Sequence, residues 1–545
     1  MGRRGILQQS KIIPTMGGAA RRYYVDTTGG NDANTGHSAG AAWKTIAKVN
    51  ASTFLPRERV LFKRGETWRE QLTIPSSGAS GRPIYFGAYG SGNLPIITGA
   101  SNITGFADGG SDIWDVGSIT TQPLVVVIGN NAPQLKAANR AACTTPGSWY
   151  WAANTLSVYA TSNPDGTVEA GQRNRAIDTN GKAYLTFENL TIKHSNALHS
   201  TGGGIWISTG NTIIVDGCTI IEHAGCGVLI SGVSASVSIQ DTTANYNGEN
   251  GIYNNNGLST SQIICDNTIS NNGWAAGASS GFGSGYQGSL TSGEIYGNTV
   301  DSNGLAGPAG TQHGIYLGSI DGSTVSIHNN NCMGHTQGSG IKARSSATIY
   351  KNYCANGATG ISCGDNSTFN VTYSISYNVL VNCTSNSFIE QIVGTGTRTL
   401  YLYNNIMYNG GSGGNGSLKI DLDNAVLDIR NNILSVCSGL RIMWINATQT
   451  GTVIIDHNLY YQPGEATPFR SGATEQSWAT WQGIPYDTNG FNEDPIFIDA
   501  PGGDFRLGIS SPCINAGIDV GLITDYIGNP ITGNPDIGAY EYVVP

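Results

Sequence analysis

The chain has 545 residues, of which 76 are glycine and only 12% are charged. This composition excludes a coiled coil and disfavours a helix-rich enzyme, while an apolar content of 39% excludes wholesale disorder. A net charge of −9 disfavours a general nucleic-acid binder. No run approaches the ~18 consecutive apolar residues of a membrane helix. We therefore expect a soluble all-β protein that binds neither nucleic acid nor membrane.

Residues 1–22 read as a leader, which we expect to be flexible. They are basic but lack the apolar run of about 7–15 residues that marks a secretory signal peptide. We expect either an extracellular protein whose signal has been removed or a virion-associated protein.

The next two segments differ in pattern. Residues 23–100 combine strand-like runs with a short helical stretch at Trp43–Val49, and we expect an N-terminal cap and the first coils of a repeat. Residues 101–180 interrupt that pattern and contain the run SWYWAANTLSVYA. We expect an inserted β excursion that leans on the main body.

Residues 181–462 carry an internal repeat. Each unit is an apolar strand, an asparagine, a second short strand and a turn, and the units follow one another at steps of 22 to 32 residues. This is the period of a solenoid with one coil per repeat. The repeated asparagines are Asn189, Asn267, Asn298, Asn330, Asn352, Asn378, Asn405, Asn432 and Asn458, with Gly217 and Thr242 in the gap. We expect asparagines that stack and adopt the left-handed conformation at the bend; about 11 coils predict a rod of roughly 50 Å.

A second register follows in each coil and predicts which side chains face outward. Alternation along a strand points every other residue to the same side. The inward residues are Ile205, Val228, Ile252, Ile315, Ile341 and Ile361. The outward residues are Trp206, Leu229, Tyr253, Tyr316, Lys342 and Ser362. We expect the outward set to lie on one parallel sheet.

With these two registers the chain resembles the pectate-lyase-like superfamily of right-handed parallel β-helices. The resemblance implies a single-stranded parallel β-helix of about 11 or more coils with an N-terminal capping helix. Residues 463–545, which include DPIFIDAPGGDFRL and PDIGAYEY, resemble the C-terminal coils and cap of bacterial and phage-encoded β-helix proteins. The superfamily contains polysaccharide lyases, polygalacturonase-type hydrolases and phage tailspike depolymerases.

The ten cysteines favour core packing over disulfides. Cys265, Cys332 and Cys354 sit inside strand-like patterns, where a thiol behaves as a small apolar residue. No CxxC pair or Cys/His metal spacing is present. We expect most of the cysteines to be free and buried.

Basic residues gather at one place in the repeat. No Lys or Arg stands between Lys193 and Lys342, and Arg344 follows two residues later, so both point outward. His313 and Tyr316 fall one coil earlier, about 5 Å away in the stacking direction. β-Elimination of a uronate needs a group that neutralises the carboxylate, a base and an acid for the leaving oxygen. We expect Arg344 to neutralise, Lys342 or His313 to act as base and Tyr316 as acid.

Two family patterns bear on these residues. The alginate lyase and chondroitinase B group is similar in fold and uses a Lys and an Arg with calcium, but from different coils, whereas Lys342 and Arg344 share one. Polygalacturonases have a His-Gly followed later by Arg-x-Lys. Here His313 precedes a glycine, the basic pair is reversed, and the upstream paired aspartates are missing.

Aromatic and acidic residues give the remaining candidates. Trp206, Tyr253 and Tyr286 offer flat faces for sugar rings. Asp365 and Glu390 come from neighbouring coils and qualify as a hydrolytic carboxylate pair, with Glu249 as another candidate for the groove.

Calcium is possible but is not required by the sequence. Asp321, Asp365 and Glu390 are weak candidates to bind Ca²⁺ through oxygen ligands, because no DxDxDG-type loop is present. Arg344 has a structural alternative, an ion pair with Asp365.

Three functions remain open. The first is a lyase that cleaves a uronate-containing polysaccharide by β-elimination. The second is a glycoside hydrolase that uses a carboxylate pair. The third is a non-catalytic glycan-binding phage fibre or adhesin rod. A monomer is favoured, and a trimer is possible for a tailspike.

Overall fold

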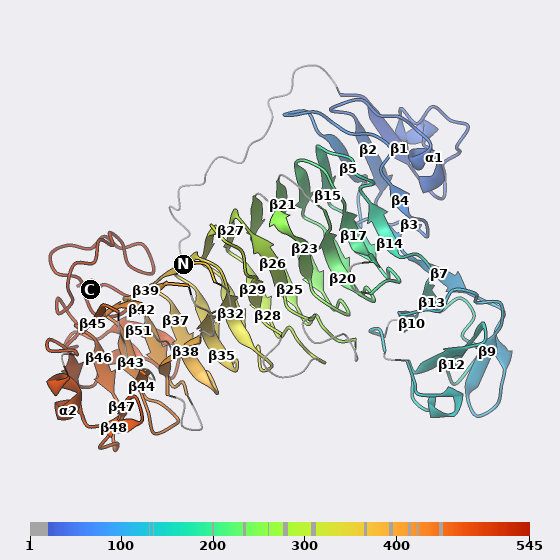
Figure 1. Cartoon of the computed structure of the whole chain (residues 1–545). Coiled ribbons are helices and arrows are strands. Elements are labelled where there is room, and N and C mark those ends of the chain that lie inside the picture. The colour runs from blue at the N-terminus through green and yellow to red at the C-terminus, as the bar shows by residue number, and fades with distance from the viewer. Residues whose placement is uncertain are drawn as a thin grey trace.

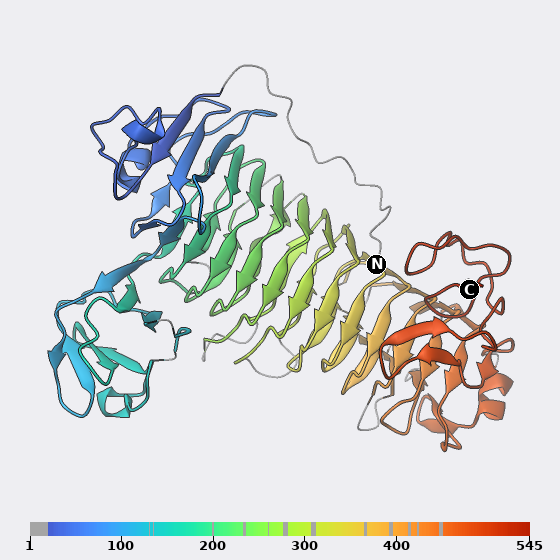
Figure 2. The same cartoon turned by 180° about the vertical axis from the view of Figure 1, so that it is seen from behind.

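A computed structural model shows a long rod built from three parallel sheets (Figure 1, Figure 2). It describes residues 20–129, 131–134, 136–198, 201–232, 236–259, 261–275, 282–306, 312–364, 368–391, 396–411, 416–421, 425–445, 451–484 and 486–544. Each sheet has 14 strands, and each coil of the central part adds one strand to sheets A, B and C in turn; the last strand of sheet C, β48, instead pairs antiparallel with β47. At about 4.8 Å per step the stacked strands extend roughly 60 Å. The predicted all-β parallel solenoid is confirmed, with more coils than the eleven we counted.

The strands of the three sheets are as follows. Sheet A contains β1 (Arg22–Val25), β2 (Arg59–Lys63), β5 (Ile84–Tyr89), β15 (Leu185–Glu188), β18 (Ile213–Asp216), β21 (Val237–Gln240), β24 (Gln262–Cys265), β27 (Ser292–Tyr296), β30 (Thr324–His328), β33 (Ala347–Tyr350), β36 (Val371–Ser376), β39 (Arg398–Tyr403), β42 (Ala425–Arg430) and β45 (Val453–Asp456). Sheet B contains β3 (Thr67–Trp68), β6 (Ile96–Thr98), β16 (Thr191–Lys193), β19 (Thr219–Ile221), β22 (Thr243–Asn245), β25 (Thr268–Ser270), β28 (Thr299–Asp301), β31 (Asn331–Met333), β34 (Tyr353–Ala355), β37 (Val379–Val381), β40 (Ile406–Tyr408), β43 (Ile433–Ser435), β46 (Leu459–Tyr461) and β49 (Phe491–Asn492). Sheet C contains β4 (Leu72–Thr73), β14 (Arg175–Asp178), β17 (Gly203–Ile207), β20 (Cys226–Ile230), β23 (Ile252–Ser259), β26 (Tyr286–Leu290), β29 (Ile315–Leu317), β32 (Ser339–Ala343), β35 (Thr359–Cys363), β38 (Asn386–Gln391), β41 (Leu418–Asp421), β44 (Met443–Ile445), β47 (Phe469–Ser471) and β48 (Thr474–Gln476).

The core of the rod is a stack of inward side chains. On sheet C, neighbouring strands pair in register through one inward position per coil. The members of this row are fully buried, namely Ile205, Val228, Ile252, Tyr286, Ile315, Ile341, Ile361 and Phe388. The inward residues predicted from alternation are therefore confirmed. The ten cysteines are all free and buried, also as predicted.

A ladder of buried asparagines follows the bend between sheets A and B. The backbone N–H and the side-chain Nδ2 of each asparagine donate to Oδ1 of the next, at 2.9–3.1 Å. The ladder runs through Asn267, Asn298, Asn330, Asn352, Asn378, Asn405, Asn432 and Asn458. It ends on Asp487, whose Oδ1 accepts from Asn458.

Two details of the predicted ladder are wrong. The left-handed residue is the one before each ladder asparagine, for example Asp266 (φ 56°) and Lys351 (φ 56°), because the asparagine side chain must turn inward to stack. Asn189 and Gly217 take this left-handed position themselves. The ladder positions in those coils are therefore the next residues, Leu190 and Cys218, and Cys218 N–H donates to Thr242 Oγ1.

The N-terminal end is covered by a short helix. Helix α1 (Ile46–Asn50) buries Ile46 and Val49, and the side chain of Thr45 caps it by accepting from Lys48 N–H. Trp43 precedes the helix instead of starting it. A 3-10 turn spans Ala39–Ala41.

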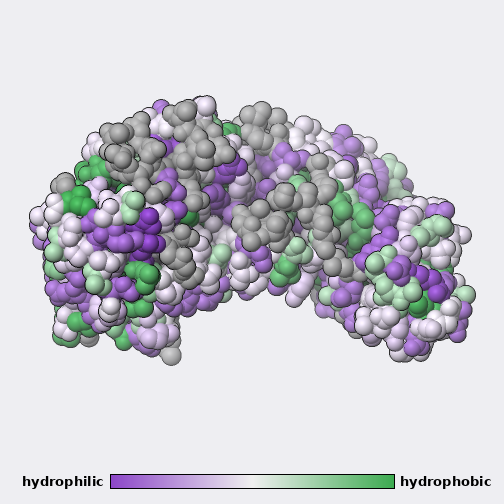
Figure 3. Space-filling view, turned by 60° about the horizontal axis from the view of Figure 1, so that its bottom comes forward, coloured by the Kyte–Doolittle hydropathy of each residue, from purple (hydrophilic) through white to green (hydrophobic). Residues whose placement is uncertain are grey.

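The excursion projects from the rod between β6 and β14. It consists of β7 (Ala100–Ile103), β8 (Ala107–Asp108), β9 (Ile113–Val116), β10 (Val126–Ile128), β11 (Trp149–Ala152), β12 (Thr155–Tyr159) and β13 (Val168–Gly171), with a 3-10 turn at Arg140–Ala142. These strands pair antiparallel in two small sheets over their own apolar cluster. β14 already pairs in sheet C, so the rod resumes at Arg175 and not at residue 181. In Figure 3 the excursion forms the lobe at the right of the view.

The C-terminal tail folds back along the rod. After α2 (Trp478–Gly483), the hairpin β50 (Phe497–Asp499) and β51 (Asp504–Leu507) and the segment that follows pack on the outer face of sheet B. Val379, Ile406 and Leu459 on that face are fully buried beneath it. No helix of the described part of the chain is long and apolar enough to cross a membrane.

Candidate functional site

One row of outward side chains runs along sheet C, and we call it the sheet C row. Register pairing places its members at the same position of successive strands. They are Asp178, Trp206, Leu229, Tyr253, Gln287, Tyr316, Lys342, Ser362, Ile389, Lys419, Trp444 and Arg470. The six outward residues predicted from the repeat are all in this row.

The basic and aromatic candidates meet in the middle of the row. Tyr316 on β29 and Lys342 on β32 are register partners on neighbouring strands. Arg344 follows β32, and its Nη1 donates to the Tyr316 phenol oxygen at 2.9 Å. Lys342 Nζ donates to Ser362 Oγ at 2.9 Å on the next strand. The structure therefore brings together the cation pair and the phenol that the sequence predicts.

His313 lies under this group as a neutral ring. It stacks on Tyr316 with ring centres 5.4 Å apart and planes 12° apart, and its Nδ1 accepts from Ser339 N–H at 2.9 Å. Burial, with help from the Lys342 charge and His335, lowers the pKa of His313 to about 3. A neutral imidazole that accepts at Nδ1 carries its proton on Nε2. The one acceptor nitrogen of His313 is therefore already used by Ser339, and Lys342 is the better candidate for the base.

The aromatic candidates have different environments. Tyr286 is fully buried and lies in the inward row, where its hydroxyl donates to Gln262 Oε1 at 3.0 Å. Its prediction as a sugar platform is wrong because β26 places Gln287, and not Tyr286, on the outer side. Trp206 faces outward, but the Arg175 guanidinium covers its ring at 3.2 Å from the ring centre. Tyr253 is half-buried and contacts Phe282 edge-on.

Burial governs the acidity of Tyr253. Burial is the largest cause that raises its pKa to about 12, and the nearby Cys226 and Glu249 add to it. Tyr253 therefore keeps its proton at neutral pH, and its hydroxyl donates to Asn255 Oδ1 at 2.9 Å.

Two of the predicted carboxylates, Glu390 and Glu249, do not lie on this face. Glu390 is fully buried and pairs in register with Cys363 and Ile420, so it points into the core. Burial raises its pKa to about 8, against an opposing effect of Arg398. Glu249 is also fully buried and accepts from Cys226 Sγ at 3.6 Å. The groove positions predicted for both are therefore wrong.

The candidates for calcium find little support. Asp365 lies outside the described residues, so its predicted roles have no structural account. Asp321 is exposed in a turn between β29 and β30. Within the described ranges no group of three or more His, Cys, Asp or Glu residues is arranged to hold a metal ion.

A second cationic stretch of the row was missed by sequence reasoning. The Trp444 ring lies between Lys419 Nζ and the Arg470 guanidinium, each 4.4 Å from its centre. Glu475 pairs with Arg441 at 2.5 Å, and Asp421 pairs with Lys419 at 3.2 Å. The outward register continues beyond GISCG through the next three strands, and this continuation contains the signal for Lys419 and Trp444.

A buried histidine joins the excursion to the rod. His194 Nδ1 lies 2.9 Å from Glu169 Oε2, and His194 Nε2 lies 2.9 Å from Glu222 Oε2. Arg69 also pairs with Glu169. The hydrogen bond from His194 is the largest cause that lowers the pKa of Glu169 to about 2. Because the two carboxylates bind opposite nitrogens of one ring, this group holds two parts of the chain together.

Two sequence comparisons give a match. The family described as "Right handed beta helix region" matches residues 151–287. A lacto-N-biosidase of Bifidobacterium longum subsp. longum is 38% identical over 100 residues, which are 17% of this chain and 6% of that protein. The chain thus spans only a small part of the length of this curated relative.

Two solved structures share the architecture. The structure of XylC in complex with xylose has a TM-score of 0.58 at 14% identity, over 96% of this chain and 98% of that one. A structure described as a glycoside hydrolase has a TM-score of 0.50 at 10% identity, over 72% of this chain and 97% of that one. At these identities the similarity concerns the fold. Together with the parallel coils of sheets A to C, these findings show that the chain has the fold of a right-handed parallel β-helix.

Proposed function

We propose that the chain is a polysaccharide-degrading enzyme that cleaves a uronate-containing polymer by β-elimination on the outer face of sheet C. The observation that carries this proposal is the contact between Arg344 and Tyr316, with Lys342 at the register position next to Tyr316. The names of the relatives support action on carbohydrate, since one is a lacto-N-biosidase and another was solved with xylose.

The geometry suits three different tasks. A guanidinium has five N–H donors, so Arg344 can hold Tyr316 and still pair with a substrate carboxylate through its planar fork. This pairing makes the α proton of the uronate more acidic. Lys342 lies one strand spacing from Tyr316 and, in its neutral amine form, takes that proton. The Tyr316 oxygen already accepts from Arg344, so its own proton is available for the leaving glycosidic oxygen.

Variants of the cluster test this assignment on a polymer that the wild-type protein cleaves. Arg344→Lys keeps the charge but loses the fork, Lys342→Met removes the amine, and Tyr316→Phe removes only the hydroxyl. Each is expected to lower kcat/KM by about 10²-fold or more, the usual contribution of a positioned acid or base. The matched control is Arg430→Gln on sheet A, which should keep its turnover. Wild-type rates in all three cluster variants would refute the site.

A glycoside hydrolase is the second candidate. It is favoured by the 38% identity to a stretch of the lacto-N-biosidase and by the glycoside hydrolase that shares the fold. Hydrolysis would release reducing ends without an unsaturated sugar, and it would require a carboxylate pair other than Glu249 and Glu390, which are buried. A protein that binds polymer but leaves its length unchanged would instead be a glycan-binding rod.

A further inference from the structure

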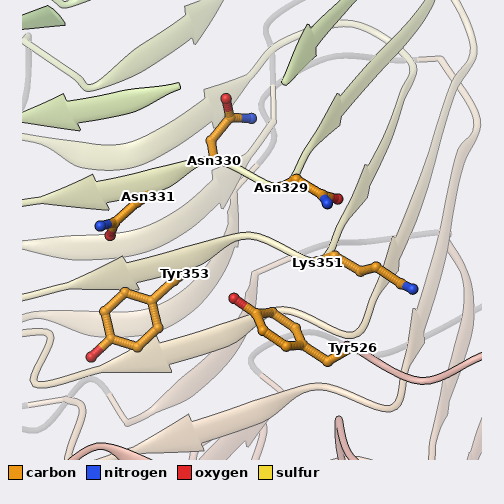
Figure 4. A pocket seen from close by; sticks show the side chains of 6 residues that line it. All are labelled: Asn329, Asn330, Asn331, Lys351, Tyr353 and Tyr526. Carbon is orange, nitrogen blue, oxygen red and sulfur yellow. The ribbon is translucent and has the colours of Figure 1, made fainter. Parts of the chain in front are cut away.

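A small cavity lies on a different side of the rod, where the C-terminal tail meets the bend between sheets A and B. Its volume is about 370 Å³, at the lower end of the range of about 300–1,000 Å³ for small-molecule sites. Figure 4 shows the lining side chains, which come from two successive coils and from the tail. They are Asn329, Asn330, Asn331, Lys351, Tyr353 and Tyr526.

The cavity exists because the tail covers only part of sheet B. The next four members of the outward row are fully buried beneath the tail, namely Val379, Ile406, Ile433 and Leu459. Tyr353 and Asn331, the two preceding members of this row, remain half-buried. The cavity therefore opens at the edge of the tail, between its aromatic ring Tyr526 and the uncovered strands.

The tail side of the cavity is held in a fixed conformation. Tyr526 N–H donates to Ala539 O at 2.9 Å. The carboxylate of Asp525 is fully buried and accepts from the backbone N–H groups of Ile527, Asn529 and Glu541 at 2.7–3.0 Å. The side that carries Tyr526 is thus formed before any ligand arrives, which reduces the entropy lost on binding.

The lining groups match the chemistry of a sugar. Asn331 Oδ1 is buried and has no hydrogen-bond partner among the described residues. Buried polar atoms are nearly always paired, so this oxygen is suited to accept from a ligand hydroxyl. Tyr353 and Tyr526 offer aromatic surface. Lys351 Nζ donates to Thr524 Oγ1 at 3.3 Å, and an ammonium group has two further N–H donors.

We propose that this cavity binds a single sugar residue that carries a carboxylate. In this arrangement Asn331 accepts from a ring hydroxyl, Lys351 pairs with the carboxylate, and the ring lies against Tyr353 and Tyr526. The site is on the sheet B side, so it is separate from the sheet C row and does not depend on the activity proposed there. It would hold one unit of an anionic glycan while the rest of the polymer extends elsewhere on the rod.

Isothermal titration of the full chain with free monosaccharides tests this site. The probes are glucuronate and galacturonate, with glucose and galactose as their neutral counterparts. We expect at least one uronate to bind and its neutral counterpart to bind about tenfold more weakly, as expected for loss of one charge-assisted hydrogen bond. Failure of both uronates to bind, or equal binding of the neutral sugars, would overturn the proposal.

Two variants locate the binding. Asn331→Asp keeps the shape but adds a negative charge, and Lys351→Met removes the cation; each should weaken uronate binding about tenfold or more. Their thermal unfolding is compared with the wild type to verify the fold. Arg430→Gln on sheet A should leave the titration unchanged, and Tyr316→Phe on sheet C is titrated to show which site holds the sugar. If binding is lost in Tyr316→Phe and kept in the two cavity variants, the sugar binds in the sheet C row and the cavity proposal is wrong.

Discussion

The asparagine ladder predicts a large and local loss of stability when one member is removed. The Asn352 side chain accepts from Asn330 N–H and Nδ2 at 3.0 Å each. It donates to Ile327 O at 2.9 Å, Tyr350 O at 3.1 Å and Asn378 Oδ1 at 3.0 Å. Asn352→Ala leaves buried donors and acceptors on both neighbouring coils without partners. At about 1–3 kcal/mol for an unsatisfied buried group, we expect a loss of about 3–5 kcal/mol.

Equilibrium denaturation in guanidinium measures this loss, with two matched variants. Asn352→Thr restores one acceptor, as Thr242 does when it accepts from Cys218 N–H, and should recover about 1 kcal/mol. Asn102→Ala changes an exposed asparagine on β7 and should stay within about 0.5 kcal/mol of the wild type. A loss below about 1 kcal/mol in Asn352→Ala, or no gain from Thr over Ala, would refute the reasoning.

Three further predictions concern buried groups. The pKa of Glu169 is lowered to about 2, so its carboxylate stabilises the fold above its ordinary pKa, and this stabilisation is lost as the pH falls toward 2. Glu169→Gln should therefore lower the free energy of unfolding by up to about 3 kcal/mol at pH 7 and leave it unchanged near pH 2, as measured by denaturant titration. The pKa of Glu390 is raised to about 8, so the free energy of unfolding of the wild type should fall by up to about 5 kcal/mol between pH 4.5 and 8. Glu390→Gln should show no such decline, and parallel pH curves for the two proteins would contradict this. A Cβ at Gly314 would lie 2.5 Å from Gly340 O, so Gly314→Ala should lower the free energy of unfolding by about 1–3 kcal/mol, and unchanged stability would show that the strands can separate freely.

The architecture is accessible from sequence because it rests on two strong periodicities. The recurring asparagine gives the coil length, and alternation within each strand gives the sides, so the inward row around Ile315 and the outward row around Lys342 follow directly. The position of Asn189 is off by one residue because the bend has two successive positions, and only the second, here Leu190, turns inward. Asparagine occurs at both positions in coils such as Asn404–Asn405, so residue type alone does not distinguish them.

The site is less accessible because single residues depart from the average pattern. Tyr286 stands at an inward position where most other coils have isoleucine, and its burial is tolerated because its hydroxyl donates to Gln262. Glu390 occupies an inward position two residues after Phe388, so alternation extended through that strand would have predicted its burial. The neutral state of His313 depends mainly on its burial, with help from the Lys342 charge, and both arise only once the coils stack.

The most direct test of the central claim is the near-ultraviolet absorbance of unsaturated uronates during incubation with alginate, pectate, glucuronan and glycosaminoglycans, with and without calcium. We expect the absorbance to rise on one of these polymers with the wild-type protein and to remain flat with Arg344→Lys. A flat trace with the wild-type protein while reducing ends accumulate would contradict β-elimination and assign the chain to the hydrolases.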